Sequence, residues 1–180
     1  LLCLSSIIIP ASVFAGNPDV AVVYFSLPEN TTAFSSVDGL TSASLISEKG
    51  PGTTAFVAEA IESALEKMYQ MDVPKMSISV RDKYEGNFDR VVARNHAEAA
   101  SDAEPDLVNS SDFNAVVTAK TVFIGYPTWN MNIPRAVASF MKSVDWRGKR
   151  IAVFNTNDGY GAGRGVQSIL SLAQGAQQLG

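Results

Sequence analysis

Three uninterrupted apolar runs, separated by longer amphipathic stretches, constrain the fold of this chain more than any other feature. The runs are Val20 to Phe25, Thr121 to Tyr126 and Ile151 to Phe154, and most of their residues are β-branched or aromatic. Strands in which polar and apolar residues do not alternate are typical of a sheet that helices cover on both faces. Met76 to Val80 predicts one further, short strand.

The stretches between these runs predict helices. Apolar residues recur at helical spacing from Phe56 to Met68, and more weakly from Phe88 to Ala100. Thr53 or Thr54 can cap the first of these helices, and Pro134 suits the first turn of a later one. Another helix is expected after the last apolar run. Because strand and helix alternate, we expect an α/β fold with a doubly wound parallel sheet and right-handed crossovers.

Length and composition fit a single globular domain. The 180 residues suit one core, and 46% apolar with 18% charged residues is an ordinary globular balance. The net charge of −4 and the lack of a Lys/Arg cluster argue against nucleic-acid binding, which requires many cations that neutralise phosphates.

Residues 1–15 are expected to be an incomplete signal peptide, and residues 16–180 the folded domain. An apolar stretch from Leu1 to Ile9, the break at Pro10 and the small-residue cleavage site Val13-Phe14-Ala15 favour this interpretation. The stretch is too short to span a membrane. It lacks a basic region and an initiator Met, so we expect the sequence to begin inside a longer precursor. A hydrophobic first strand or helix is the alternative.

Export would place the mature protein in the bacterial periplasm or outside the cell, without a stable membrane span. Cys3 is the only cysteine and lies in the expected leader. The mature chain would therefore have no disulfide framework and no thiolate metal site.

Three loops follow the predicted strands at the rim where open parallel sheets bind ligands. The first joins Ser26 to a helix that starts after Gly52, and its hydroxyls and helix N-terminus suit a phosphate. The second runs from Pro127 to Asn132, where Trp129 can cover a flat aromatic ring. The third, Thr156 to Gly163, has glycines for close backbone approach. Each has a plainer alternative: an ordinary N-cap, a Trp folded onto the core, and a flexible connection.

None of these loops contains a set of hydrolytic residues. His96, the only histidine, is expected on a helix far from the rim, so a metal hydrolase is unsupported. Ser26-Leu27-Pro28-Glu29 follows the first strand, where a nicotinamide-binding domain needs a G-x-G-x-x-G turn.

Taken together, five segments resemble the flavodoxin-like family: Tyr24-Phe25-Ser26, Gly52-Thr53-Thr54, Gly125-Tyr126-Pro127-Thr128-Trp129, Arg147-Gly148-Lys149 and the loop from Thr156 to Gly163. They are most similar to exported bacterial flavodoxin-like proteins with an insertion in the phosphate loop, here residues 27–51. The resemblance covers Val20 to Gly180 and implies the strand order 2-1-3-4-5. The last strand and helix are expected to be missing from a C-terminally truncated chain, which would leave Ile151 to Phe154 as a bare sheet edge.

The resemblance also implies a binding site for flavin mononucleotide (FMN) in three parts. The 5′-phosphate would be held by Ser26, Gly52, Thr53 and Thr54; the ring would be lined by Pro127, Thr128, Trp129, Asn130 and Met131; and the other side would be closed by Thr156, Asn157, Asp158, Gly159, Tyr160 and Gly161. Two residues depart from the family pattern. Thr53 stands where Asn is usual, and Asn130 stands where a second Trp or a Gly-containing turn is common.

The function implied is electron or hydride transfer through bound FMN, without a catalytic side chain. Three hypotheses remain: an FMN-dependent oxidoreductase that reduces a quinone-like acceptor, an electron carrier with a redox partner protein, and a flavodoxin-shaped binding module without catalytic activity. Asp158 on the ring loops, with Arg135 and Arg164 just outside, predicts a site poor in cations and a low flavin potential. The insertion is expected to cover the flavin or to dock a partner.

Overall fold

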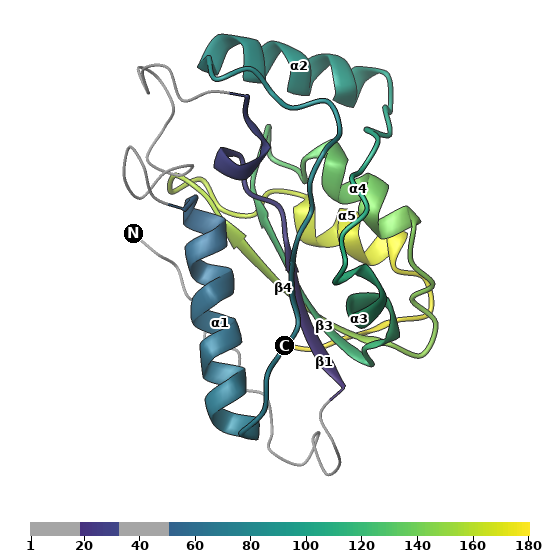
Figure 1. The fold of residues 1–180 in the computed structure, drawn as a ribbon. Coiled ribbons are helices and arrows are strands. Elements are labelled where there is room, and N and C mark those ends of the chain that lie inside the picture. The colour runs from purple at the N-terminus through teal and green to yellow at the C-terminus, as the bar shows by residue number, and fades with distance from the viewer. Residues whose placement is uncertain (1–18, 33–50) are drawn as a thin grey trace.

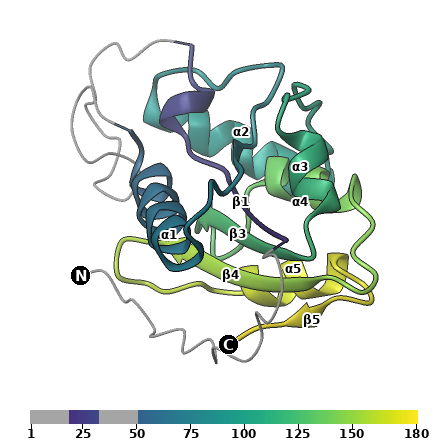
Figure 2. The same cartoon turned by 60° about the horizontal axis from the view of Figure 1, so that its bottom comes forward.

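Five parallel strands form one sheet in the order β2-β1-β3-β4-β5 (Figures 1 and 2). The computed structural model describes residues 19–32 and 51–180. The strands are β1 (Val20–Tyr24), β2 (Lys75–Ser77), β3 (Thr121–Pro127), β4 (Arg150–Thr156) and β5 (Gln177–Gln178). The order is the doubly wound one expected from the sequence, so the predicted α/β fold class is confirmed.

Helices lie on both faces of this sheet (Figure 1). The helices of the described residues are α1 (Thr53–Tyr69), α2 (Phe88–Ala100), α3 (Phe113–Thr118), α4 (Arg135–Lys142) and α5 (Gly165–Leu172), and a short 3-10 helix, η2, spans Pro28–Asn30. Of these, α2 lies beyond the upper end of the sheet in Figure 1. On one face, Val22 packs in a core with Ala58 and Leu65 of α1. On the other, Val23 packs in a larger core that includes residues of α3, α4 and α5.

The central strands are buried on both faces, which explains their uninterrupted apolar sequence. Val22 and Val23 point to opposite cores, and both are fully buried, as is Ile124 of β3. Successive side chains of a strand point to opposite faces, so a strand between two helix layers has no polar side.

The expectation that no fifth strand is present was wrong. Gln177–Gln178 pairs with Arg150 and Ile151 of β4, and the Leu179 N–H donates to the Ile151 carbonyl at 2.7 Å. Ile151 is therefore not part of a bare edge. Two exposed glutamines give no strand signal in the sequence; the backbone groups of β4 decide where the chain pairs. No helix follows β5 in the described residues.

Other local predictions also differ from the structure. The predicted strand from Met76 to Val80 ends at Ser77 as part of β2, and Val80 instead forms an antiparallel bridge with Leu107. Helix α3 was not expected. Neither Thr53 nor Thr54 caps α1, because the N-cap is Gly52 without a side-chain hydrogen bond.

The expected signal peptide, Cys3 and residues 33–50 of the expected insertion lie outside the described residues. Export and the role of the insertion therefore remain predictions. No helix in the described ranges is long and apolar enough to cross a membrane.

Candidate functional site

The loops after β1, β3 and β4 meet at the carboxyl ends of the strands, at the upper end of the sheet in Figure 1. Thr156, the last residue of β4, lies at the centre of this meeting point. Its hydroxyl is 2.7 Å from the hydroxyl of Thr54 on α1, and its carbonyl accepts the Thr128 N–H at 2.8 Å. All three threonines are buried. Residues that are far apart in the sequence, and that the sequence assigned to one site, are thus in direct contact.

The start of α1 forms a tight cradle, defined here as Ser26, Gly52, Thr53 and Thr54. A Cβ atom on Gly52 would lie 2.0 Å from Ser26 Oγ and 2.7 Å from Pro28 Cδ. The φ of Gly52 is −62°, which any residue adopts, so this position needs glycine for space rather than for conformation. The first N–H groups of a helix have no partner inside it, and the N-cap residue of α1, Gly52, has no side chain that could cap them. The cradle therefore suits an anion.

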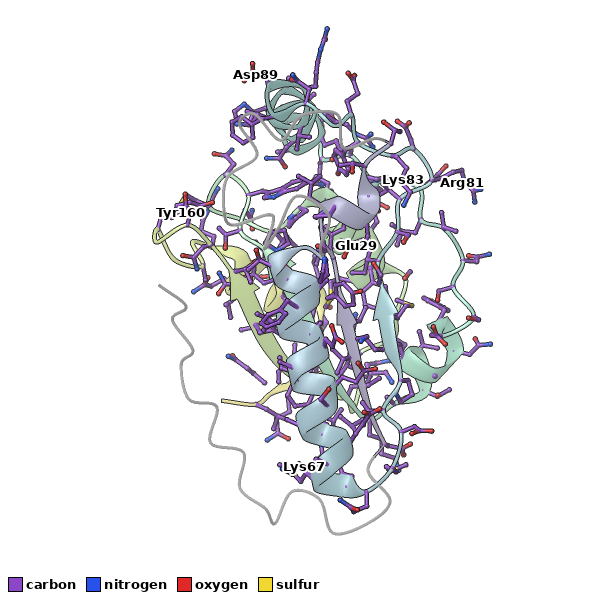
Figure 3. The ribbon with its side chains drawn as sticks, turned by 60° about the vertical axis from the view of Figure 1, so that its left-hand side comes forward. Glu29, Lys67, Arg81, Lys83, Asp89 and Tyr160 are labelled. Atoms are coloured by element: carbon purple, nitrogen blue, oxygen red, sulfur yellow. The ribbon has the colours of Figure 1, made fainter. Side chains whose placement is uncertain are left out.

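Two charged side chains lie close to the cradle. The Gly52 N–H donates to Glu29 Oε1 at 3.4 Å, and Lys83 Nζ donates to the Glu29 carbonyl at 2.8 Å (Figure 3). Burial lowers the pKa of Lys83, and the nearby Glu29 charge partly opposes this shift. Burial, and next the charge of Glu29, raise the pKa of Tyr24.

A tight turn shapes the loop after β3. Trp129 and Asn132 exchange two backbone hydrogen bonds of 2.9 Å, and the two residues between them, Asn130 and Met131, have φ of 47° and 59°. These are the features of a type I′ turn, in which Asn is a favoured residue. Asn130 thus suits the left-handed backbone conformation that this position adopts. Asn130 and Met131 are exposed, whereas Pro127 is buried.

Trp129 makes two T-shaped aromatic contacts with the core. Its ring lies 5.5 Å from that of Phe25 and 5.4 Å from that of Tyr84, both edge-on at 90°. The Trp129 side chain is half-buried, so one part of its ring contacts the core and another part is exposed. This geometry fixes the orientation of the indole.

The loop after β4 is held in place by side chains. Asn157 Oδ1 accepts the N–H groups of Gly159 and Gly161, both at 3.0 Å, and the Tyr160 hydroxyl donates to the Thr128 carbonyl at 3.0 Å. Tyr160 nevertheless remains 50% exposed. Burial and the neighbouring Asp158 raise its pKa. The third loop is therefore an ordered element that leans against the second.

Sequence reasoning missed two residues that support the site. Asn30 is fully buried; its amide donates to the carbonyls of Ser26 at 2.8 Å and Ile78 at 3.0 Å, and its Oδ1 accepts the Val80 N–H at 2.9 Å. Tyr84 is fully buried behind Trp129, and its hydroxyl donates to Glu98 at 3.0 Å. Asn30 ends the short helix η2 and Tyr84 forms an isolated bridge, and segments this short have no hydrophobic periodicity that could predict them.

Other singled-out residues lie elsewhere. His96 is exposed on α2, as expected of a solvated histidine. The Arg135 guanidinium binds the carbonyls of Asp102 and Ala103 and the Asp102 carboxylate, so it is held at the end of α2. A cavity of about 280 Å³ lies away from the three loops, between β2, residues 104–109 and α4, and none of the predicted site residues lines it.

A family model and several solved structures are similar to the chain. A family model described as flavodoxin matches residues 49–176. Provisionally named flavoproteins from Bacteroides eggerthii DSM 20697 and Bacteroides uniformis ATCC 8492 are both 20% identical to the chain, with TM-scores of 0.62 and 0.63. The alignments cover 88% and 91% of this chain, and 84% and 87% of theirs.

A flavoprotein from Lactobacillus acidophilus NCFM, solved in complex with FMN, is 15% identical, with a TM-score of 0.60 and coverage of 89% of either chain. At such identities these likenesses show a shared fold. No curated protein matches the sequence.

Proposed function

Since the chain belongs to the flavodoxin family, we propose that it binds FMN at the carboxyl ends of β1, β3 and β4 and transfers electrons or hydride. The observation that supports this most is the direct contact of all three loops through Thr54, Thr128 and Thr156. The Lactobacillus flavoprotein with the same fold holds FMN, which adds support. FMN would supply the redox chemistry, and the chain would bind and orient it.

The cradle fits the phosphate end of FMN. Its donors are hydroxyls and the first N–H groups of α1, which favour an anion without a lysine. The space in front of Ser26 exists only because residue 52 has no Cβ atom. Thr53 is expected to add a hydroxyl where the family usually has an amide.

The second and third loops would orient the ring and exclude water from it. Trp129 and Tyr160 present half-exposed aromatic side chains on neighbouring loops, and the hydrogen bond from Tyr160 to the Thr128 carbonyl keeps these loops together. Because Trp129 is fixed by Phe25 and Tyr84, its contact with a ring would need little reordering.

A binding module without catalytic activity is the second candidate, and Thr53 favours it. The partner of the redox protein would be a small quinone-like acceptor or a second protein. Oxidation of NAD(P)H with a quinone, in the absence of any partner protein, would identify an enzyme rather than a carrier.

Reconstitution with FMN tests the proposal. The mature protein is expected to turn yellow and to bind FMN more tightly than riboflavin, which lacks the phosphate. Gly52→Ala should weaken FMN binding by at least about tenfold, or 1.4 kcal/mol, because the new methyl group overlaps Ser26 and Pro28. Titration of flavin fluorescence measures these affinities.

Gly148→Ala is the matched control. It also adds one methyl group, but no atom lies within 4 Å of the new Cβ position, so FMN affinity should stay within about twofold of the parent protein. A folded parent protein that stays colourless with excess FMN would contradict the proposal.

A further inference from the structure

A carboxylate lies where the cradle would receive a phosphate. Glu29 Oε1 accepts the Gly52 N–H at 3.4 Å, at the point where α1 begins. Figure 3 shows Glu29 at this end of α1. Its second oxygen, Oε2, is buried and has no hydrogen-bond partner among the residues that the structure describes. Glu29 is not among the residues proposed to hold FMN.

The helix N-terminus stabilises the Glu29 carboxylate, but the carboxylate lacks a full set of hydrogen bonds. The positive end of a helix attracts any anion, whether a carboxylate or a phosphate. However, a hydrogen bond of 3.4 Å is long, and a buried carboxylate oxygen without a donor loses its hydration without replacement. The nearby Lys83 ammonium donates to the Glu29 backbone carbonyl and leaves Oε2 without a hydrogen-bond donor. The side chain is therefore held weakly enough to be displaced.

We infer that the Glu29 carboxylate occupies the anion position at the start of α1 and competes there with the phosphate of a bound ligand. This inference rests on the proposed FMN site. A phosphate at the cradle must either displace the carboxylate or remain beside a like charge, and both lower its affinity. Glu29 thus sets how strongly the site prefers a phosphorylated flavin over a neutral one.

Removing the charge of Glu29 tests the competition. Glu29→Gln keeps the size of the side chain and an oxygen for the Gly52 N–H. The variant is expected to bind FMN and inorganic phosphate about three- to tenfold more tightly than the parent protein, in the range of a charge at a helix terminus. Its affinity for riboflavin should change by less than about twofold, because riboflavin has no phosphate.

Glu85→Gln is the control for net charge. Glu85 lies one residue after Tyr84, and its side chain is 69% exposed, near Arg90. The variant removes the same charge without touching the cradle, so its FMN and phosphate affinities should match those of the parent. An unchanged or lower FMN affinity in Glu29→Gln would overturn the inference, and so would an equal gain for riboflavin.

A measurement without flavin separates this inference from the proposed function. The amide resonance of Gly52 should respond to inorganic phosphate at a lower concentration in Glu29→Gln than in the parent protein. If neither protein binds FMN but this difference is observed, the FMN proposal fails and the competition stands. If neither Gly52 resonance responds to phosphate, the competition is disproved.

Discussion

Asn30 joins three parts of the candidate site through one side chain. It forms hydrogen bonds with the backbone of Ser26 at the cradle, of Ile78 after β2 and of Val80, which forms the bridge with Leu107. The resemblance assigned residues 27–30 to an insertion, yet Leu27 and Asn30 are both buried in the domain. These residues therefore belong to the packed structure of the domain.

Asn30→Ala should lower the free energy of unfolding by about 3 kcal/mol, because it leaves buried backbone groups without partners. Asn30→Asp should be at least as harmful near pH 7, since a carboxylate would face the two carbonyls that now accept from the amide. Urea denaturation measures both effects. Asn114→Ala, at an exposed position of α3, should change the stability by less than about 0.5 kcal/mol. Equal losses at the two positions would refute this role of Asn30.

The turn after β3 and the start of α5 depend on each other. The Arg164 N–H donates to the Met131 carbonyl at 2.8 Å, and a Cβ atom on Gly163 would lie 2.2 Å from that carbonyl oxygen. Met131 adopts a left-handed backbone conformation that its side chain disfavours. The contact of Gly163 and Arg164 with the Met131 carbonyl thus stabilises a turn that the local sequence disfavours.

Comparing two glycines with positive φ isolates this contact. Gly148→Ala adds a methyl group in open space, so it should cost only the strain of its φ of +74°, about 1 kcal/mol. Gly163→Ala adds a collision with backbone, and its loss should be larger by at least about 1 kcal/mol. Thermal or urea unfolding of both variants gives the difference. Losses of the same size would show that the contact with Met131 contributes nothing.

The fold buries two tyrosines, Tyr84 and Tyr126, whose pKa values are raised. Burial raises the pKa of Tyr126 to about 12, and burial with the charge of Glu98 raises that of Tyr84 well above its usual range. The folded state therefore retains phenolic protons at a pH where the unfolded chain has lost them. The stabilisation is complete below pH ~10 and is lost as the pH rises towards 12.

We expect the free energy of unfolding to fall above pH ~10, by up to about 1.4 kcal/mol per pH unit for each such tyrosine. Tyr126→Phe should reduce the slope of the free energy of unfolding against pH by the contribution of one tyrosine. At pH 7 this variant should be as stable as the parent protein or more so, because the Tyr126 hydroxyl is buried and unpaired among the described residues. Urea denaturation at several pH values tests this. An identical slope in the variant would mean that Tyr126 ionises equally in both states.

The apolar runs and their spacing were enough to predict a parallel sheet and most helices, because a strand that is buried on both faces has an uninterrupted apolar sequence. The strand order came from the resemblance to the flavodoxin-like family. The rim loops could be located because they follow the strands. The contact between Thr54 and Thr156 confirms that the first and third loops meet. Whether the residues of these loops hold FMN remains a prediction.

Some features became known only from the tertiary structure. They depend on backbone hydrogen-bonding groups at a strand edge or on residues far away in the sequence. The pairing of Gln177 and Gln178 is set by the edge of β4, and the place of Asn30 by carbonyls up to 48 residues away. The position of Glu29 at the start of α1 likewise depends on its contact with Gly52, 23 residues away along the chain. Hydrophobic periodicity depends on residues that are close together in the sequence. A buried polar group instead needs a hydrogen-bond partner that is close in space, and one sequence alone does not identify that partner.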